Sequence, residues 1–472
     1  MNGDDLCYLS ATQAMALFHD GRLSPVELLE AVIARYESIA GTVNPFADRY
    51  FDEARRRARE SEAKFARKDG RLRRLEGIPM AVKENSPIQG KRMTSASLID
   101  TDRVAGRTDP AIERLMRAGA NVFARTTMPE FAWLYATHSR LWGVTRNPWR
   151  LDVSVGGSSG GSAAALAAGA TTIATGGDST GSIRQPASQC GIVGYQAPYG
   201  AIPTFSSSNT YVHHGPMTRT VEDARVMANI MAGPHPLDPN SLPKRPTIKG
   251  GAGDLKGMKI AYAIDMGHHE VIEDVRVQTL EALAALADAG AELVEIPVDW
   301  ASEAIRLGHG NQEFLFCGML EKAVAEHGDV LSDYVPELLD TARSFSAEDY
   351  RRSFEVADVV WEEHLGPMFA GHHAFVMPTV SCPEIPAANW QRTMLPVNGK
   401  EVTDTDTSMT VLWNMFGRCP VLAVPSGRTR AGLPTGIQLV GRPHDEATVF
   451  RLGAALEARR PWLDAAERRP AL

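Results

Sequence analysis

The chain has 472 residues, of which 44% are apolar, and a formal net charge of −8. An acidic balance of this size argues against nucleic acid or an anionic membrane surface as a direct partner. No stretch reaches the roughly 20 apolar residues that a membrane-spanning helix needs, and the five widely spaced cysteines fit neither a disulfide framework nor a metal site.

The N-terminal part is expected to be helical up to about residue 68. Ser24 precedes Pro25 and is followed three positions later by Glu27, which is the pattern of a helix that begins with a capping box. A second, highly charged helix follows, in which neighbouring glutamates balance the basic run at 55–59. Residues 76–135 then alternate between short strands and helices.

The rest of the chain alternates between strands, helices and one long connection. Three helices are expected, at residues 160–169, 221–231 and 271–289. The last is flanked by apolar strands at 259–264 and 293–298, so a strand–helix–strand unit is predicted here. Residues 234–256 are rich in Pro and Gly, which is typical of a surface connection, and residues 302–370 are mainly helical in pattern.

A long run rich in Gly and Ser occupies residues 153–195. Small side chains let a backbone approach a ligand closely, and the apolar stretches within this run distinguish it from a flexible linker. Two serines stand out, Ser158 in GGSSGG and Ser182 in DSTGSIR, and Lys83 lies upstream in the apolar segment GIPMAVKEN. Two hydroxyls and a buried lysine are the parts of a serine hydrolase that uses lysine as its base.

These segments resemble the amidase signature family. That family places a lysine on a buried strand, a serine after a cis non-proline peptide bond, and a nucleophilic serine in D-x-x-G-S-I-R-x-P. Lys83, Ser158 and Ser182 match these three positions, and the segments HHGPMTRTVEDA and WNMFGRCPVLAVPSG also match. The resemblance implies one large α/β domain, with a central mixed β-sheet covered by helices on both faces, and no metal or cofactor.

The resemblance also suggests how the chain is divided. We expect an N-terminal helical segment, a signature core with the catalytic residues, a Pro/Gly-rich connection and a C-terminal part of the same domain, at residues 1–68, 69–232, 233–257 and 258–472. The C-terminal part would carry a mainly helical insertion at about 302–400 that borders the substrate pocket.

The chemistry of amide cleavage assigns a role to each of the three residues. Ser182 would attack the carbonyl and form an acyl-enzyme. Lys83 must be partly neutral to accept a proton, and its apolar surroundings would lower its pKa in that direction. Ser158, after a cis bond from Gly157, would pass the proton between Ser182 and Lys83.

The segment before the nucleophile would supply the oxyanion hole. Its donors would be backbone N–H groups of Ser179, Thr180 and Gly181, the three residues that lead up to Ser182. Most relatives have two consecutive glycines here, whereas this chain has a threonine, which must adopt a negative φ. We expect the loop to be held by three further residues, Ser159, Asp178 and Arg184.

The identity of the substrate is less strongly marked in the sequence. Aromatic and apolar candidates for the pocket are Met128, Tyr135, Tyr211, Cys317 and Trp413. Since nothing resembles a dedicated binding site for a carboxylate, we expect the substrates to be neutral, fairly apolar amides, anilides or carbamates. A side activity as a urethanase or esterase is also expected.

Two other functions stay open. The glutaminase subunit of a tRNA-dependent amidotransferase shares this chemistry, but usually keeps the double glycine and a YGRVSRYG-like segment, where this chain has YGAIPT at 199–204. A non-catalytic scaffold on the same fold would not need Lys83, Ser158 and Ser182. We expect a cytoplasmic enzyme, since the acidic N-terminus lacks the apolar core of a signal peptide. Its partner would be a small-molecule amide or carbamate, with a homodimer left open.

Overall fold

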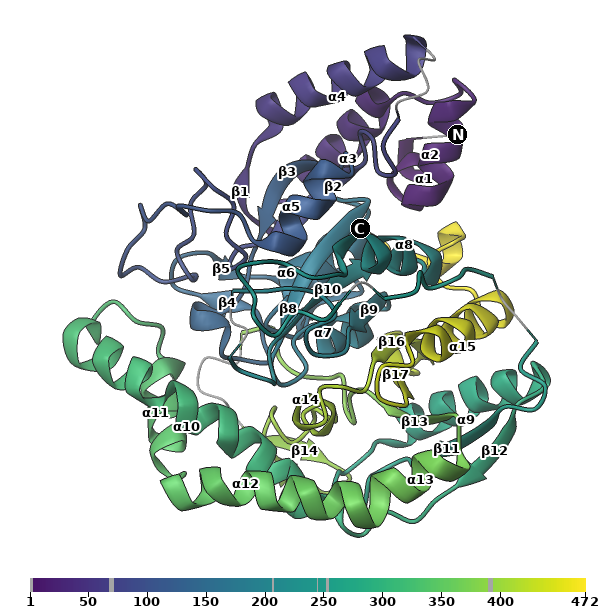
Figure 1. Cartoon of the computed structure of the whole chain (residues 1–472). Coiled ribbons are helices and arrows are strands. Elements are labelled where there is room, and N and C mark those ends of the chain that lie inside the picture. Colours follow the sequence, from purple (N-terminus) through teal and green to yellow (C-terminus); the bar gives the residue numbers. More distant parts are fainter. Residues whose placement is uncertain (1–2, 68–71, 206–207, 244, 252–253, 389–393) are drawn as a thin grey trace.

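One mixed β-sheet runs through the molecule (Figure 1). The computed structural model describes the whole chain except residues 1–2, 68–71, 206–207, 244, 252–253 and 389–393. In sheet order the eleven strands are β1 (Phe46–Arg49), β3 (Asn121–Thr126), β2 (Pro79–Lys83), β8 (Ile173–Asp178), β10 (His213–Thr218), β9 (Val193–Gln196), β16 (Val421–Arg428), β17 (Pro434–Gly441), β13 (Ala374–Pro378), β11 (Lys259–Tyr262) and β12 (Glu292–Glu295).

The sheet is parallel near its two ends and antiparallel in its centre. β2 is parallel to both β3 and β8, and β11 is parallel to both β12 and β13. The other neighbouring pairs are antiparallel. The central mixed sheet expected from the family resemblance is therefore confirmed. Three small two-stranded sheets lie outside it: β4 (His138–Ser139) with β5 (Gly143–Val144), β6 (Arg146–Asn147) with β7 (Arg150–Ser154), and β14 (Leu395–Val397) with β15 (Lys400–Val402).

The N-terminal part is helical, as predicted. Its helices are α1 (Gly3–Cys7), α2 (Ala11–His19), α3 (Pro25–Ile39) and α4 (Phe51–Arg67). At the start of α3 the Glu27 N–H donates to Ser24 Oγ at 3.1 Å, and the Ser24 N–H donates to the Glu27 carboxylate at 2.8 Å, which completes the expected capping box. In α4 some of the basic residues are paired, with Arg57 2.7 Å from Glu53 and Arg55 2.7 Å from Glu30.

Further helices and 3-10 turns lie between the strands. They are α5 (Pro110–Arg117), η1 (Glu130–Ala132), α6 (Gly160–Ala167), α7 (Arg184–Cys190), α8 (Val221–Met231), α9 (Glu273–Asp288), α14 (Leu412–Met415), α15 (Glu446–Arg459) and η3 (Ala466–Arg468). The helix predicted at 221–231 has those bounds, and β11, α9 and β12 form the predicted strand–helix–strand unit. α6 ends two residues earlier than predicted, where the chain turns through Gly169 at a φ of 75°.

A helical layer follows the strand–helix–strand unit. It contains α10 (Ala301–His327), α11 (Tyr334–Arg343), α12 (Ala347–Val360), the π-helix η2 (Trp361–Leu365) and α13 (Gly366–Gly371). In Figure 1 these green helices lie along the rim opposite the purple N-terminal helices. The mainly helical character predicted for residues 302–370 is thus confirmed. α10 and α11 pack through an apolar cluster against residues 131–136, which precede the Gly/Ser run.

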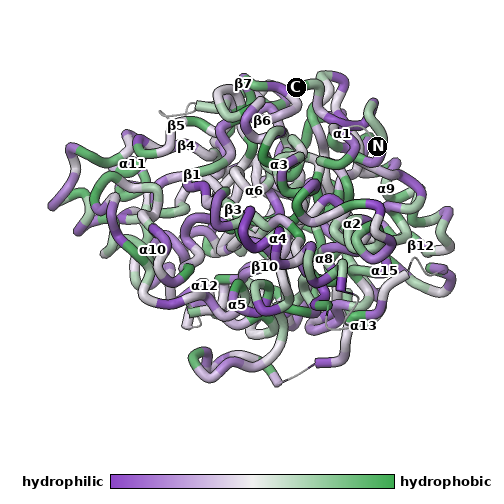
Figure 2. The backbone as a smooth tube through the Cα atoms, turned by 90° about the horizontal axis from the view of Figure 1, so that it is seen from above, coloured by the Kyte–Doolittle hydropathy of each residue, from purple (hydrophilic) through white to green (hydrophobic). Residues whose placement is uncertain are grey.

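The outer helices bury some of their apolar residues and expose others. In Figure 2 hydrophilic and hydrophobic stretches alternate along α10 and α11. α11 buries Leu338 and Leu339, whereas α10 leaves Leu315 and Met319 exposed. No helix among the described residues is both long and apolar enough to cross a membrane. Over the same residues, the structure gathers no group of three or more His, Cys, Asp or Glu side chains that could hold a metal ion.

Candidate active site

Lys83 is the last residue of β2, and its side chain is buried at the end of that strand. Its Nζ donates hydrogen bonds to Ser158 Oγ at 2.8 Å and to the carbonyl oxygen of Gly177 at 3.3 Å. Burial lowers the pKa of Lys83 to about 7, and the negative charge of Asp178 opposes this shift only in part. A lysine with this pKa is partly neutral near pH 7 and can therefore accept a proton.

Ser158 lies in the turn between β7 and α6. The peptide bond from Gly157 to Ser158 is cis, as the family resemblance implies. Gly157 has no space for a side chain, since a Cβ there would lie 2.3 Å from the carbonyl oxygen of Leu134. This turn presents the buried Ser158 hydroxyl to the amine of Lys83.

Ser182 lies in the loop between β8 and α7, next to the turn that carries Ser158. Ser159 joins the two segments, because its N–H donates to the Ser182 carbonyl at 3.2 Å and its hydroxyl donates to the Gly177 carbonyl at 3.2 Å. No hydrogen bond joins the hydroxyls of Ser158 and Ser182 in the described structure. Catalytic hydrogen bonds often tighten only when substrate is bound.

The loop from Ser179 to Ser182 departs from the expected oxyanion hole at one position. Gly181 adopts a φ of 133°, and the β-branched Thr180 avoids positive φ, as the sequence required. The Gly181 N–H, however, donates to Asp178 Oδ1 at 2.7 Å and is no longer available to a substrate. The N–H groups of Ser179, Thr180 and Ser182, to which the described structure assigns no partner, are the remaining donors.

Asp178 and Arg184 form a fully buried ion pair next to this loop. Arg184 Nη2 lies 3.0 Å from Asp178 Oδ1, and its Nε lies 3.1 Å from Oδ2. Burial alone would raise the pKa of Asp178, but the charge and hydrogen bonds of Arg184, together with Asn414 and the Ile183 N–H, bring it well below its usual range. The carboxylate therefore stays ionised and holds the loop by charge-assisted hydrogen bonds.

Arg184 also ties the loop to a distant part of the chain. Its guanidinium donates to the Thr410 carbonyl at 2.8 Å, to Gln438 Oε1 at 2.7 Å and to Asn414 Oδ1 at 2.6 Å. Asn414 in turn donates to Asp178 Oδ1 at 2.8 Å. The sequence motif identified Asp178 and Arg184, but it gave no local signal for Thr410 or Asn414, which lie more than 220 positions away.

Ser182 faces a cavity of about 40 Å³. A space of this size accommodates only a few water molecules. Its wall is mixed, because Trp133, Leu134 and Leu338 line it with apolar groups, whereas Thr180 and Glu313 add polar ones. The space beside Ser182 is therefore narrow and partly apolar.

A larger hollow of about 720 Å³ adjoins this cavity. Three residues line both spaces, namely His309 and Glu313 of α10 and Thr405. The outer hollow carries charged side chains at its wall, among them Arg306 and Glu337. The sequence did not predict this charged vestibule, because α10 lacks a motif that marks which of its faces is open.

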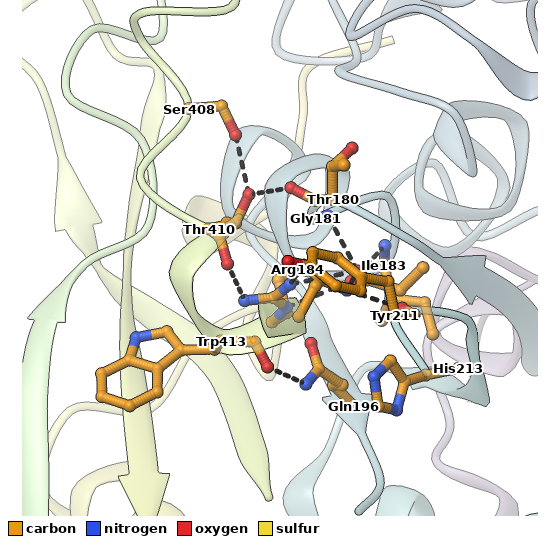
Figure 3. Close-up of polar contacts among 12 residues, drawn as sticks. Thr180, Gly181, Ile183, Arg184, Gln196, Tyr211, His213, Ser408, Thr410 and Trp413 are labelled. Carbon is orange, nitrogen blue, oxygen red and sulfur yellow. Dashed lines mark hydrogen bonds and ion pairs between the residues drawn. The ribbon is translucent and has the colours of Figure 1, made fainter. Parts of the chain in front are cut away.

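The structure separates the residues proposed for the substrate pocket. Tyr135 lines the cavity at Ser182, whereas Tyr211 lines a different hollow of about 560 Å³. Met128 and Trp413 are buried, and the Trp413 indole packs in an apolar cluster away from the loop (Figure 3). Cys317 packs against the apolar cluster between α10 and α11. Of the five candidates, only Tyr135 lines the cavity at Ser182.

Comparisons with known proteins agree over nearly the whole chain. A family model described as amidase matches residues 27–450. The chain is 31% identical over 479 residues to an acylamidase of Rhodococcus erythropolis, covering 98% of both chains. It is 32% identical over 471 residues to a subunit of the glutamyl-tRNA(Gln) amidotransferase of Geobacter metallireducens, covering 93% of this chain and 95% of the other. Among solved structures it resembles a bacterial aryl acylamidase, with a TM-score of 0.87, 25% identity and coverage of 96% and 97% of the two chains.

Proposed function

The chain belongs to the amidase family and is a hydrolase of amides, and from this premise we propose that it cleaves the C–N bond through an acyl-enzyme on Ser182, with Ser158 as proton relay and Lys83 as base. The observation that carries this assignment is the buried amine of Lys83, 2.8 Å from Ser158 Oγ, with a pKa lowered to about 7 by burial.

The first half of the reaction forms the ester. Ser182 Oγ attacks the substrate carbonyl carbon while its proton passes to Ser158, whose own proton passes to the neutral Lys83. The negative charge that develops on the carbonyl oxygen is stabilised by the N–H groups of Thr180 and Ser182. The C–N bond then breaks, and the departing amine takes back the proton from Lys83 through Ser158.

The second half of the reaction restores the enzyme. Water attacks the acyl carbon, and its proton follows the same path through Ser158 to Lys83. The ester bond to Ser182 breaks, the carboxylic acid leaves, and the proton held by Lys83 returns to Ser182 Oγ. Because one lysine serves as base and then as acid in each half, a pKa near neutrality suits both tasks.

We propose neutral amides, anilides or carbamates as substrates, with the small side of the molecule next to Ser182. The narrow cavity and its apolar wall of Trp133, Leu134 and Leu338 support this assignment. The acylamidase relative and the aryl acylamidase structure support it as well. The rest of the substrate would lie in the vestibule, which accepts polar groups.

The glutaminase of an amidotransferase is the second candidate, because one relative from such an enzyme is 32% identical over most of the chain. A panel of substrates separates the two functions. The purified chain alone would be assayed with glutamine, an aryl anilide, a linear aliphatic amide and an aryl carbamate. We expect turnover of at least one of the last three and none of glutamine. Ammonia from glutamine alone, or activity only after partner subunits are added, would favour the amidotransferase.

The proposed nucleophile is tested by Ser182→Ala. We expect this variant to lose turnover and reaction with a fluorophosphonate, because no other hydroxyl can form the ester. Ser426→Ala is a matched control, since Ser426 is also buried but bonds to Thr435 in the sheet. Labelling of a folded Ser182→Ala variant at the wild-type rate would contradict the assignment, and an unlabelled wild type would favour the scaffold.

We propose further that the enzyme works with a small-molecule substrate as its only partner, without nucleic acid, membrane, metal or cofactor. The net charge of −8 supports the part of this proposal that concerns nucleic acid and anionic membranes. A cytoplasmic location and a homodimer are part of the same proposal. Cell fractionation tests the location, and light scattering of the purified chain tests the oligomeric state.

A further inference from the structure

The carbonyl oxygen of Thr180 accepts two hydrogen bonds from side-chain hydroxyls. Thr410 Oγ1 donates to it at 2.5 Å, and Tyr135 Oη donates to it at 2.9 Å. Both donors are buried, with 0% of Thr410 and 7% of Tyr135 exposed. Figure 3 shows Thr410 between Thr180 on one side and Ser408 on the other. A carbonyl with two such donors is fixed in direction.

The opposite end of the same peptide group is held as well. The N–H of this peptide belongs to Gly181 and donates to Asp178 Oδ1 at 2.7 Å. The carboxylate that accepts it is fixed by the buried guanidinium of Arg184. The peptide group between Thr180 and Gly181 is therefore held at both ends. Two hydroxyls donate hydrogen bonds to its oxygen, and its N–H donates one to the Asp178 carboxylate.

Hydrogen-bond direction fixes the order of donors in this chain of hydroxyls. A hydroxyl has a single proton, and Thr410 gives its proton to the Thr180 carbonyl. Ser408 Oγ, 2.8 Å from Thr410 Oγ1, must then be the donor to Thr410. Burial raises the pKa of Tyr135, so its phenol remains a donor throughout the neutral range. The hydroxyls of Thr410 and Tyr135 thus both donate to the Thr180 carbonyl oxygen, and the hydroxyl of Ser408 donates to Thr410.

The loop needs such support because its backbone is soft at Gly181. A glycine rotates about φ with little steric cost, and at this position a Cβ would lie 1.8 Å from Thr410 Oγ1, so no side chain can stiffen it. Rotation of the 180–181 peptide would turn the two peptide groups on either side of it. Those neighbours carry the N–H groups of Thr180 and Ser182, two of the remaining oxyanion donors.

We infer that Tyr135 and Thr410 are positioning residues of the oxyanion hole, which hold the Thr180 carbonyl and thereby aim the N–H groups of Thr180 and Ser182 at the reacting carbonyl oxygen. We call these two residues the hydroxyl clamp. The inference rests on the proposed role of Ser182. The clamp acts on the charge that develops in the transition state, so its loss should lower kcat and leave KM nearly unchanged.

The test compares variants that lose one hydroxyl with variants that keep it. We expect Thr410→Val and Tyr135→Phe each to lower kcat about tenfold, and the double variant to approach the roughly 10²–10³ that follows from losing one oxyanion donor. Thr410→Ser keeps the hydroxyl and should restore most of kcat. Thr407→Val is a matched control, because Thr407 is equally buried in the same segment but donates to the Asp404 carbonyl at 2.7 Å.

Two further measurements separate positioning from general structural damage. A peptide-like aldehyde, which forms a tetrahedral adduct with Ser182, should bind the clamp variants more weakly in proportion to the loss of kcat/KM. The midpoint of the pH–rate profile should not move, since the Lys83–Ser158 contact is untouched. Thermal unfolding identifies any variant that fails to fold. If Thr410→Val does not fold, the kcat of Thr410→Ser is compared with that of the wild type instead.

The outcomes are distinct from those that test the proposed function. Ser182→Ala is assayed in parallel, and residual turnover there would overturn the nucleophile itself. If Ser182→Ala is inactive while the double clamp variant keeps wild-type kcat, the clamp is overturned and the nucleophile stands. A rise in KM with unchanged kcat and unchanged aldehyde affinity would also overturn the role of the clamp, because such a result means that the two hydroxyls affect only substrate binding.

Discussion

Lys83 can act as a base only while its amine is uncharged, and its burial decides the pH at which this holds. The pKa of Lys83 is lowered to about 7, from an ordinary value of 10.5, mainly because its charge would be desolvated. The neutral form therefore dominates above pH 7 and the protonated form below it. Few side chains outside histidine change charge in this range.

The pH dependence of catalysis follows from this pKa. We expect kcat/KM to fall about tenfold for each pH unit below pH 7 and to level off above it, because only the neutral amine takes the proton of Ser158. Lys83→Met should lose on the order of 10²–10⁴ in kcat, which is the usual contribution of a positioned base. Initial rates from pH 5 to 9 measure both. A wild-type profile that stays flat down to pH 5 would show that Lys83 is not the base.

The sequence identified Lys83, Ser158 and Ser182 because each lies in a short local motif, and the structure brings Lys83 and Ser158 into contact. Thr410 could not be found in this way. Its role depends on a hydrogen bond to a carbonyl 230 positions away, and a threonine in a C-terminal segment has no pattern that predicts such a contact. Trp413 was a reasonable pocket candidate by residue type, but tertiary packing buries its ring in the core.

The first residue of helix α11 makes two hydrogen bonds to the segment at residues 130–138. Tyr334 Oη donates to the His138 carbonyl at 2.9 Å and accepts a hydrogen bond from the Glu130 N–H at 2.7 Å. Four residues further on, the same helix provides Leu338 to the cavity at Ser182. The position of the cavity wall therefore depends on a phenol that lies outside the catalytic residues.

Removal of that phenol should affect stability and substrate binding rather than chemistry. Tyr334→Phe leaves the His138 carbonyl and the Glu130 N–H without this buried partner, so we expect a loss of about 1–3 kcal/mol in the free energy of unfolding. We also expect a higher KM at nearly unchanged kcat, as the wall loosens. Urea unfolding and steady-state kinetics measure the two effects.

A tyrosine at the surface supplies the control for this variant. Tyr262 Oη makes a longer, exposed hydrogen bond of 3.4 Å to Glu295, and Tyr262→Phe should change stability by less than about 0.5 kcal/mol. If Tyr334→Phe were as stable as Tyr262→Phe and kept its KM, α11 would be held by its apolar contacts alone.

Most of the well-placed elements had clear local signals. The helix at 221–231 has those bounds because Thr220 caps it, with its hydroxyl accepting from the Asp223 N–H at 3.2 Å. α10 shows the limit of such reasoning. It packs against α11, α12 and α14 while one part of it lines the vestibule, so its apolar pattern does not reveal which face is open.

At the scale of the molecule, the sheet joins two halves of the chain that are far apart in sequence. β16 pairs with β9 in antiparallel register, with Val421 opposite Gln196 and Ala423 opposite Gly194. Local patterns predicted many of the strands but not this order, because strand pairing between distant segments leaves no local signal. The described residues of the predicted connection at 233–257 are mostly exposed, although Asp238 and Leu255 are buried.

Because the sheet holds the halves together, the covalent connection should be dispensable once the protein has folded. We expect a protease site inserted after the exposed Gly250 to be cut without loss of the folded state, with activity within about twofold of the uncut protein. Gel filtration should show both fragments in one peak. The uncut protein with the same insertion is the control. Separation of the fragments in buffer would show that the pairing between β9 and β16 is too weak to hold them together.

The place of β16 in the sheet also has a consequence for synthesis on the ribosome. β9 is complete at Gln196, but its neighbour begins only at Val421. At about 5–20 residues per second, the ribosome needs roughly 10 to 45 s to supply that neighbour. During this time the nascent chain carries an apolar strand edge without its partner, which is the kind of surface that chaperones bind and that aggregation begins from. The speed of translation across residues 197–420 thus bears on how much of this enzyme a cell recovers in soluble form.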